Sequence, residues 1–131
     1  MFVNDLSVYT DDIQITKNPS WDEIRYAIEK LDGENCSEVT IGVGADREPF
    51  MTIVGGDQKF MVSVNINDQI HILSRDAIPS EASSTVILYA SGQEIDCPIR
   101  FAVDYTFMLI AADTFANSGR LDSSLKWSDS P

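Results

Sequence analysis

The last third of the chain, from Val103 to Trp127, most strongly constrains the fold. Apolar residues recur there at helical spacing and lead into Asn-Ser-Gly, a short spacer and a lone Trp. This pattern predicts a helix over about residues 102–117, with Gly119 as its C-terminal cap. The expected core-facing stripe consists of Val103, Phe107, Ile110, Ala111 and Thr114, widened by Met108, Leu109 and Phe115. A helix that is apolar over so much of its circumference is usually buried on most sides.

A second helix is expected over about residues 20–32. Ser20 and Glu23 have the spacing of a capping box, in which each side chain accepts a hydrogen bond from the backbone amide of the other residue. Apolar residues then recur every three or four positions, at Trp21, Ile24, Ala27, Ile28 and Leu31. Gly33 is expected to end this helix.

The remaining sequence alternates between apolar and polar residues, which is typical of strands with one buried face. Strands are expected at residues 39–43, 50–54, 60–66, 70–73, 85–90 and 93–97, with a short edge strand at 125–127 and another strand or hairpin within 6–15. This order predicts an α+β fold in one domain spanning residues 1–131. The expected sheet is an antiparallel meander of about five to seven strands, with the two helices packed on one face.

The chain is strongly acidic, with 21 acidic residues against 9 lysines and arginines and a formal net charge of −12. Such a charge repels phosphates and anionic lipid, so we expect basic partners and no direct binding of nucleic acid or membrane. The longest apolar run is far shorter than the ~20 residues of a membrane span, and the acidic start is unlike a secretory leader. We therefore expect a soluble, cytoplasmic protein in which Cys36 and Cys97 are buried thiols rather than a disulfide.

No motif in the chain predicts a catalytic, metal or cofactor site. His71 is the single histidine, and we expect it on a strand surface between two core-facing isoleucines. Zinc-ligand spacings and a nucleophile elbow are absent from the sequence, and neither of its glycine pairs opens a helix as a phosphate-binding loop would. The interpretation is a protein that is not an enzyme and uses no cofactor or metal. An acid–base enzyme that combines His71 with a carboxylate remains an alternative.

Acidic residues concentrate at the start of the chain. The first 48 residues hold 11 acidic and 4 basic side chains, which accounts for −7 of the −12. Two interpretations stay open: an ordinary solvated face, or a patch complementary to a basic cleft in a partner, where opposite potentials raise the association rate. Enzymes that act on nucleic acids carry such clefts because they must bind phosphates.

Several sequence features together resemble one family of bacterial immunity proteins, which is found in polymorphic toxin loci and includes inhibitors of cytosine deaminase toxins. The matching features are a Trp-led helix, a strand ending in Gly-Gly, and an apolar helix closed by Phe and Gly before a final Trp. In this chain they are Trp21, Gly55, Gly56, Phe115, Gly119 and Trp127. The sequence departs from the family pattern at Leu121, where the family often has Pro. The resemblance implies structural roles for the six matching residues: the tryptophans as core plugs, Gly119 as a helix cap, and Gly55 and Gly56 as turn residues.

The resemblance implies an immunity protein that neutralises a cognate toxin domain by occluding its active site or substrate cleft. The expected toxin is a basic, nucleic-acid-directed deaminase or nuclease, bound one-to-one by a monomer. Candidate contact residues are the acidic side chains of loops, namely Asp32, Glu34, Asp46, Glu48 and Asp57. The alternative function is a non-inhibitory binding module, such as a secretion adaptor or chaperone for a basic partner.

Overall fold

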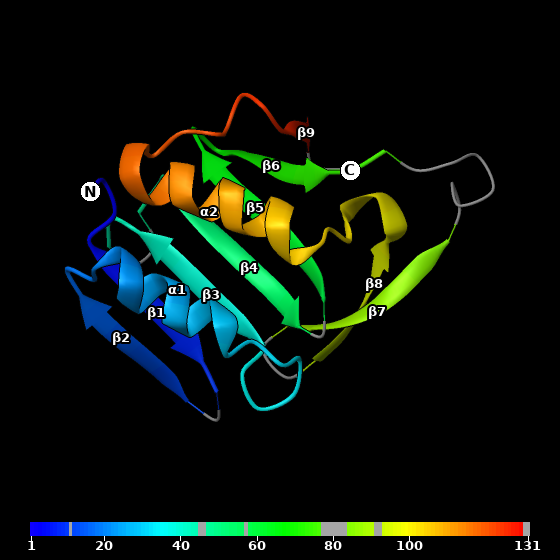
Figure 1. Ribbon diagram of the computed structural model, residues 1–131, viewed down its shortest axis with the longest axis horizontal. Helices are drawn as coiled ribbons and strands as arrows, with labels where there is room; N and C mark the ends of the chain where they lie inside the picture. The colour runs from blue at the N-terminus through cyan, green and yellow to red at the C-terminus, as the bar shows by residue number, and fades with distance from the viewer. Residues whose placement is uncertain (11, 45–46, 57, 77–83, 91–92, 130–131) are drawn as a thin grey trace.

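The computed structural model describes residues 1–10, 12–44, 47–56, 58–76, 84–90 and 93–129. Within them, seven strands form one antiparallel sheet in the order β2-β1-β3-β4-β5-β6-β9, and helices α1 and α2 cover the same face of it (Figure 1). The strands of this sheet are β1 (Asp5–Tyr9), β2 (Ile13–Lys17), β3 (Glu38–Gly42), β4 (Phe50–Gly56), β5 (Lys59–Ile66), β6 (Gln69–Ser74) and β9 (Lys126–Asp129). The predicted α+β class and the placement of the helices are confirmed.

Helix α1 (Trp21–Glu29) begins at the predicted capping box. Ser20 Oγ accepts from the amide of Glu23 at 3.1 Å, and the Glu23 carboxylate accepts from the amide of Ser20 at 3.0 Å. Its buried face consists of Ile24, Ala27 and Ile28. The helix ends earlier than predicted because the amide of Asp32 donates to the Cys36 carbonyl, which turns the chain into a loop.

Helix α2 (Tyr105–Ser118) is capped by Asp104 at its N-terminus and by Gly119 at its C-terminus. Asp104 accepts a hydrogen bond from the amide of Phe107 at 3.0 Å, and Gly119 adopts the left-handed conformation with φ of 70°. The predicted C-terminal cap is therefore confirmed. The predicted start is three residues too early, since Val103 pairs with the backbone of Phe60 instead of joining the helix.

The buried face of α2 matches the predicted stripe at Met108, Ala111 and Phe115 and differs from it elsewhere. Its buried residues are Met108, Ala111, Ala112, Phe115 and Ala116, whereas Phe107 and Ile110 are 43% and 39% exposed. Both sets have helical spacing, so periodicity could not separate them. The observed face carries three alanines, whose small side chains let the helix lie close to the sheet. The helix is therefore covered on one side and exposed on the other.

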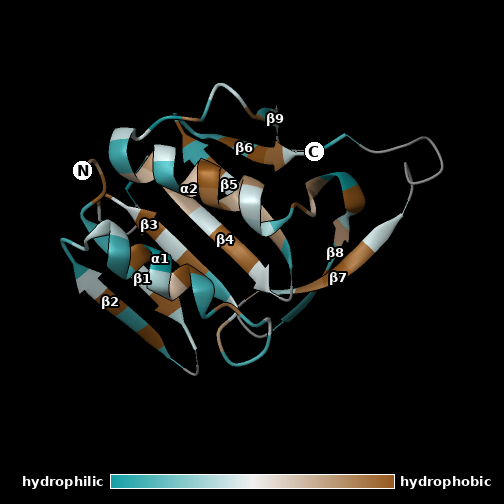
Figure 2. Ribbon diagram, in the orientation of Figure 1, coloured by the Kyte–Doolittle hydropathy of each residue, from teal (hydrophilic) through white to brown (hydrophobic). Residues whose placement is uncertain are grey.

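Alternate residues of the central strands build the core beneath the helices. Fully buried strand residues under the helices are Val39, Ile41, Met51, Ile53, Val62 and Val64. Figure 2 shows these hydrophobic bands along β3, β4 and β5. The residues between them point to the opposite face, because side chains alternate along a strand.

Strands β7 (Thr85–Ala90) and β8 (Gln93–Pro98) do not continue the meander as predicted. They pair with each other as a separate two-stranded sheet. The place beside β6 is taken by β9, with Leu73 opposite Trp127, so β7 cannot be added there. The hairpin instead closes a second cluster of buried residues, formed by Ile72, Leu88, Cys97, Phe101 and Ala102.

Candidate functional site

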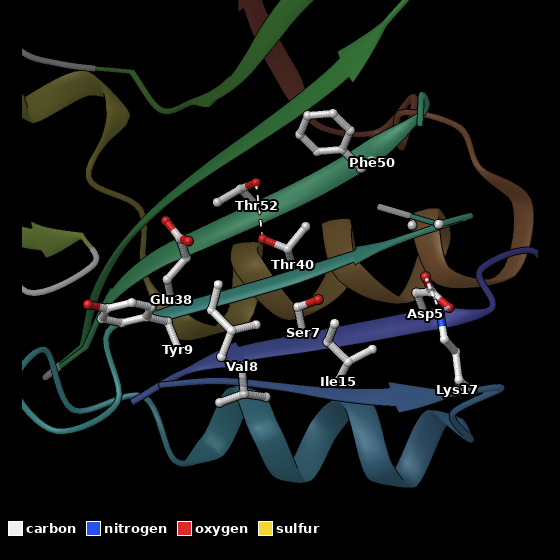
Figure 3. Close-up of a pocket in the computed structure, with 13 residues that line it drawn as sticks. Asp5, Ser7, Val8, Tyr9, Ile15, Lys17, Glu38, Thr40, Phe50 and Thr52 are labelled. Carbon is white, nitrogen blue, oxygen red and sulfur yellow. Dashed lines mark hydrogen bonds and ion pairs between the residues drawn. The ribbon is translucent and has the colours of Figure 1, made fainter. Parts of the chain in front are cut away.

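A groove of about 360 Å³ lies on the sheet face opposite the helices. Figure 3 looks into this groove, with the helices behind the sheet. We call it the helix-free groove. Its described lining comes from β1, β2, β3 and β4 and from one adjoining glycine: Asp5, Ser7, Val8, Tyr9, Ile13, Ile15, Lys17, Glu38, Thr40, Gly42, Gly44, Phe50 and Thr52.

Strand register explains why this face is hollow. Paired residues form three rows across the four strands. The middle row is Ile15, Ser7, Thr40 and Thr52. The outer rows are Ile13, Tyr9 and Glu38 on one side, and Lys17, Asp5, Gly42 and Phe50 on the other. The small hydroxyl side chains of the middle row form a floor between the longer side chains of the outer rows.

The apolar part of the groove lies on the edge strand β2. Ile13 and Ile15 are 59% and 55% exposed, and their side chains share the groove side of the strand. Tyr9 and Phe50 add aromatic surface to the same hollow. Large apolar side chains that adjoin one another in a concave surface are typical of a binding site, whereas single exposed ones are ordinary.

Carboxylates lie at both ends of the helix-free groove. At one end Asp5 accepts two hydrogen bonds of 3.1 Å from the Lys17 ammonium group. At the other end Glu38 lies beside Tyr9 (Figure 3). On the floor between them, the hydroxyls of Thr40 and Thr52 are 3.4 Å apart. The groove thus has polar ends and a floor able to donate and accept hydrogen bonds.

The predicted contact residues divide between the two ends of β3. Asp32 and Glu34 lie in the loop before this strand, and Glu48 lies in the connection after it. Asp46 and Asp57 lie outside the described residues. The structure therefore brings Asp32 and Glu34 together but separates them from Glu48 by the length of the strand.

Asp32 has a structural role in its loop. Its carboxylate accepts from the amides of Cys36 at 3.0 Å and Glu34 at 2.9 Å. These backbone donors, Cys36 first, lower the pKa of the carboxyl because they stabilise its charged form. Glu34 is exposed and lines a second hollow of about 230 Å³ together with Tyr89 of β7. Asp32 lines the same hollow, so the two acids differ in that the Asp32 carboxylate also holds the loop.

Glu48 also holds a local structure. Its carboxylate accepts from the amide of Asp68, in the turn between β5 and β6, at 2.9 Å. This bond ties two connections at the same end of the sheet. The negative charge of Glu48 remains available to a partner, since the residue is exposed.

His71, the candidate base of the alternative acid–base enzyme, lies on β6. His71 pairs with Asp129 at 3.3 Å, across β6 and β9. One of its neighbours, Ile72, is buried as predicted, but Ile70 is 38% exposed. Groups of three or more potential metal ligands are absent from the part of the chain that the structure describes. The search of those same residues finds no helix long and apolar enough to cross a membrane.

The two cysteines are free and buried, as predicted. Burial raises the pKa of the Cys97 thiol to about 11. Burial also raises the pKa of Cys36, and the nearby charge of Asp32 adds to this shift. Both groups are therefore held as neutral thiols at neutral pH, and a nucleophilic thiolate is disfavoured.

The Gly-Gly pair has a structural role that differs from the predicted turn. Gly55 and Gly56 are the last residues of β4, with φ of 111° and 152°. A Cβ on Gly56 would lie 2.5 Å from the backbone carbon of Asp32, and one on Gly55 would lie 2.3 Å from the Lys59 carbonyl oxygen. Glycine is required because other backbone segments approach the strand end too closely for a side chain.

The other motif residues also lie in the scaffold. Phe115 is fully buried, whereas Trp21 and Trp127 are partly buried at the margin of the main core. The Trp127 indole donates to the Asp122 carbonyl at 3.1 Å, which fastens β9 to the segment after α2. The tryptophans are thus half-exposed covers of the core rather than central plugs. Leu121, at the position where the resemblance expects Pro, packs against the same core.

Sequence reasoning missed the residues of the helix-free groove. Ile13 and Ile15 alternate with Gln14 and Thr16, so the sequence carried the signal of a strand with one apolar face. The pattern predicts a strand or hairpin within residues 6–15 but not where its isoleucines point, because a strand pattern alone does not show which side of the sheet the helices cover. The sheet pairing supplies the missing information.

A comparison with family models matches residues 16–129 to the family described as Immunity protein Imm1. The match spans most of the chain, from the end of β2 to the end of β9. Its bounds include both helices and all six motif residues. A search of curated proteins gives no match. The chain belongs to the Imm1 family of immunity proteins.

Proposed function

We propose that this protein neutralises a cognate bacterial toxin domain by binding it and occluding its active site or substrate cleft. The observation that carries the proposal is the Imm1 match over residues 16–129. A net charge of −12 supports it, because a toxin that binds nucleic acid presents lysines and arginines to the phosphates. Inhibition is then a matter of tight association, and the immunity protein needs no chemical step of its own.

The proposed toxin is a nucleic-acid-directed deaminase or nuclease with a basic cleft. Acidic side chains on the immunity protein meet the basic groups that the toxin uses for its substrate, and an apolar centre supplies most of the affinity. We further propose that the complex is one-to-one and forms in the cytoplasm. Neither partner chemistry nor stoichiometry requires a metal or cofactor in the immunity protein.

Co-expression with the toxin domain encoded by the neighbouring gene tests this function. We expect the protein to restore growth of cells that make the toxin domain and to co-purify with it. An unrelated immunity protein of similar charge is the control for non-specific electrostatic binding. If the protein neither restores growth nor co-purifies with the toxin domain, the proposal is refuted.

A second measurement separates inhibition from adaptor or chaperone activity. The purified, folded catalytic domain of the toxin is mixed with the immunity protein, and toxin activity is followed. We expect inhibition at one equivalent. Binding that requires an unfolded or signal segment, with no loss of activity in the folded domain, would identify a binding module instead.

A further inference from the structure

We infer that the helix-free groove is the surface that seats the toxin, and that it receives an apolar side chain with a lysine or arginine beside it. This inference rests on the proposed function and adds the face and the chemistry of the contact. It moves the centre of recognition from the acidic loops to β1, β2, β3 and β4. The acidic loops become the margin of the same surface.

The first argument is the arrangement of apolar and polar groups in the groove. Ile13 and Ile15 stand more than half exposed beside a floor of small hydroxyl side chains. An inserted side chain would bury both isoleucines, and the removal of their apolar surface from water would favour association. Polar hydrogen atoms or carbonyl groups of the partner can reach Thr40 and Thr52 on the floor. The hollow therefore suits a protruding loop better than a flat surface.

The second argument is charge. Glu38 lies at one end of the groove and the Asp5–Lys17 pair at the other. Beyond these ends lie Glu34, before β3, and Glu48, after it. The strand that these two acids flank in the sequence has five residues, so its own ends are separated by roughly 13 Å at 3.3 Å per residue. An apolar centre inside a charged margin is the ordinary anatomy of a protein–protein interface.

The third argument is the position of the groove relative to the family match. Six lining residues precede residue 16 and lie outside the matched segment: Asp5, Ser7, Val8, Tyr9, Ile13 and Ile15. The motif residues that hold the scaffold lie inside it. A surface that recognises one cognate partner must differ among proteins with different partners. Six of the thirteen lining residues thus come from the part of the fold that the family match does not span.

The helix side of the molecule is the rival surface. Phe107 and Ile110 on α2 are 43% and 39% exposed, and Tyr26 on α1 is 61% exposed. Tyr26 is covered in part by the Lys30 ammonium group, 4.5 Å from the ring centroid. These side chains stand on the outer surface of helices, while Ile13 and Ile15 line a cavity. The rival surface provides a matched control, because an exposed isoleucine is present on each side.

The test compares two variants, Ile15→Lys and Ile110→Lys, in the full-length protein. Each variant adds the same positive charge to an exposed isoleucine, so the two differ only in the face that they alter. The dissociation constant for the purified toxin domain of the neighbouring gene is measured by calorimetry, after thermal unfolding has shown that both variants fold. We expect Ile15→Lys to weaken binding about a hundredfold, as for a central interface residue, and Ile110→Lys to change it less than about threefold.

The outcomes separate the two proposals. Failure of the unaltered protein to bind would refute the proposed function itself. Binding by the unaltered protein that Ile15→Lys leaves unchanged, or that only Ile110→Lys weakens, would overturn the groove as the contact surface. If Ile15→Lys does not fold, Ile15→Thr decides instead, because threonine keeps the branched shape that suits a strand. Ile15→Thr is expected to weaken binding about tenfold, while Gln14→Thr on the opposite side of β2 leaves it unchanged.

Discussion

Gly55 and Gly56 end β4 at a point where the backbone of another segment crosses the strand. Asp32 and Gly56 form an isolated bridge there, and the crossing leaves no space for a Cβ. The close approach fixes the loop before β3, which carries Asp32 and Glu34. Two residues without side chains therefore position two of the predicted contact residues.

Gly56→Ala is expected to lower the free energy of unfolding by about 2–4 kcal/mol. The strained φ and the backbone collision both contribute to this loss. Chemical denaturation would measure it. Gly119→Ala is the control, because its Cβ would meet only the ring of Phe2, which can move. The control should lose about 1 kcal/mol, and an equal loss in both variants would contradict the assigned role of the crossing.

The buried thiols lead to a prediction about reactivity. Because burial raises the pKa of Cys97 to about 11, the folded protein at pH 8 holds this group almost entirely as the thiol. Alkylation of Cys97 in the native protein should be at least about a hundredfold slower than in the unfolded chain, whose thiols have ordinary pKa values. Mass spectrometry after timed alkylation measures both rates. Rapid native labelling would show that the thiol is accessible and ionised.

At the scale of elements, the loop between α1 and β3 combines a structural carboxylate with a second predicted contact residue. Both Asp32 and Glu34 line the second hollow, and Asp32 also organises the backbone of the loop. The sequence predicts both acids as contact residues, because both carry a negative charge and both lie in the same loop. Their separate roles follow from hydrogen bonds to backbone amides, which depend on the folded path of the loop.

Asp32→Asn should reduce stability and change its pH dependence. Backbone donors lower the pKa of Asp32 in the folded state below its unfolded value, so its contribution is present above the unfolded pKa and is lost as pH falls through the folded pKa. Thermal unfolding between pH 2 and pH 7 should therefore show a smaller loss of stability on acidification in Asp32→Asn, with a lower melting temperature at pH 7. Glu34→Gln is the matched control. A control that behaves like Asp32→Asn would contradict the structural role of Asp32.

Sequence periodicity was a sound guide to elements but not to their neighbours. The strand ranges, the capping box at Ser20 and the cap at Gly119 follow from local patterns and are confirmed. The face of α2 and the separate β7–β8 hairpin depend on which segments lie beside them. The strand β9, more than fifty residues after β6 in the chain, occupies the position that local reasoning gave to β7. Such pairing is not encoded in short-range patterns.

At the scale of the whole molecule, the two faces of one sheet differ. The helices cover one face (Figure 1), and the groove lined by Asp5 and Glu38 lies on the other. The acidic balance could be read from composition. The groove could not, because three rows of side chains from four strands have to be aligned before a hollow exists.

The net charge gives a prediction for the kinetics of toxin binding. Raising the salt concentration from about 0.02 M to about 0.5 M should slow association at least about tenfold, because screening removes long-range attraction between the acidic protein and a basic toxin. The dissociation rate should change much less, since apolar contacts in the groove are not screened. Surface plasmon resonance measures both rates. An association rate that does not depend on salt would contradict electrostatic steering.

The alternation of side chains along β1, β2 and β3 has an evolutionary consequence. In β1 and β3, residues such as Leu6, Val39 and Ile41 are buried under the helices and maintain folding, while residues between them, such as Ser7 and Thr40, line the groove with Ile13 and Ile15 of β2. Substitutions that change partner choice can therefore accumulate without disturbing the core. On our proposal, two paralogues that exchange only the groove-facing residues of their first three strands would also exchange the toxins that they neutralise.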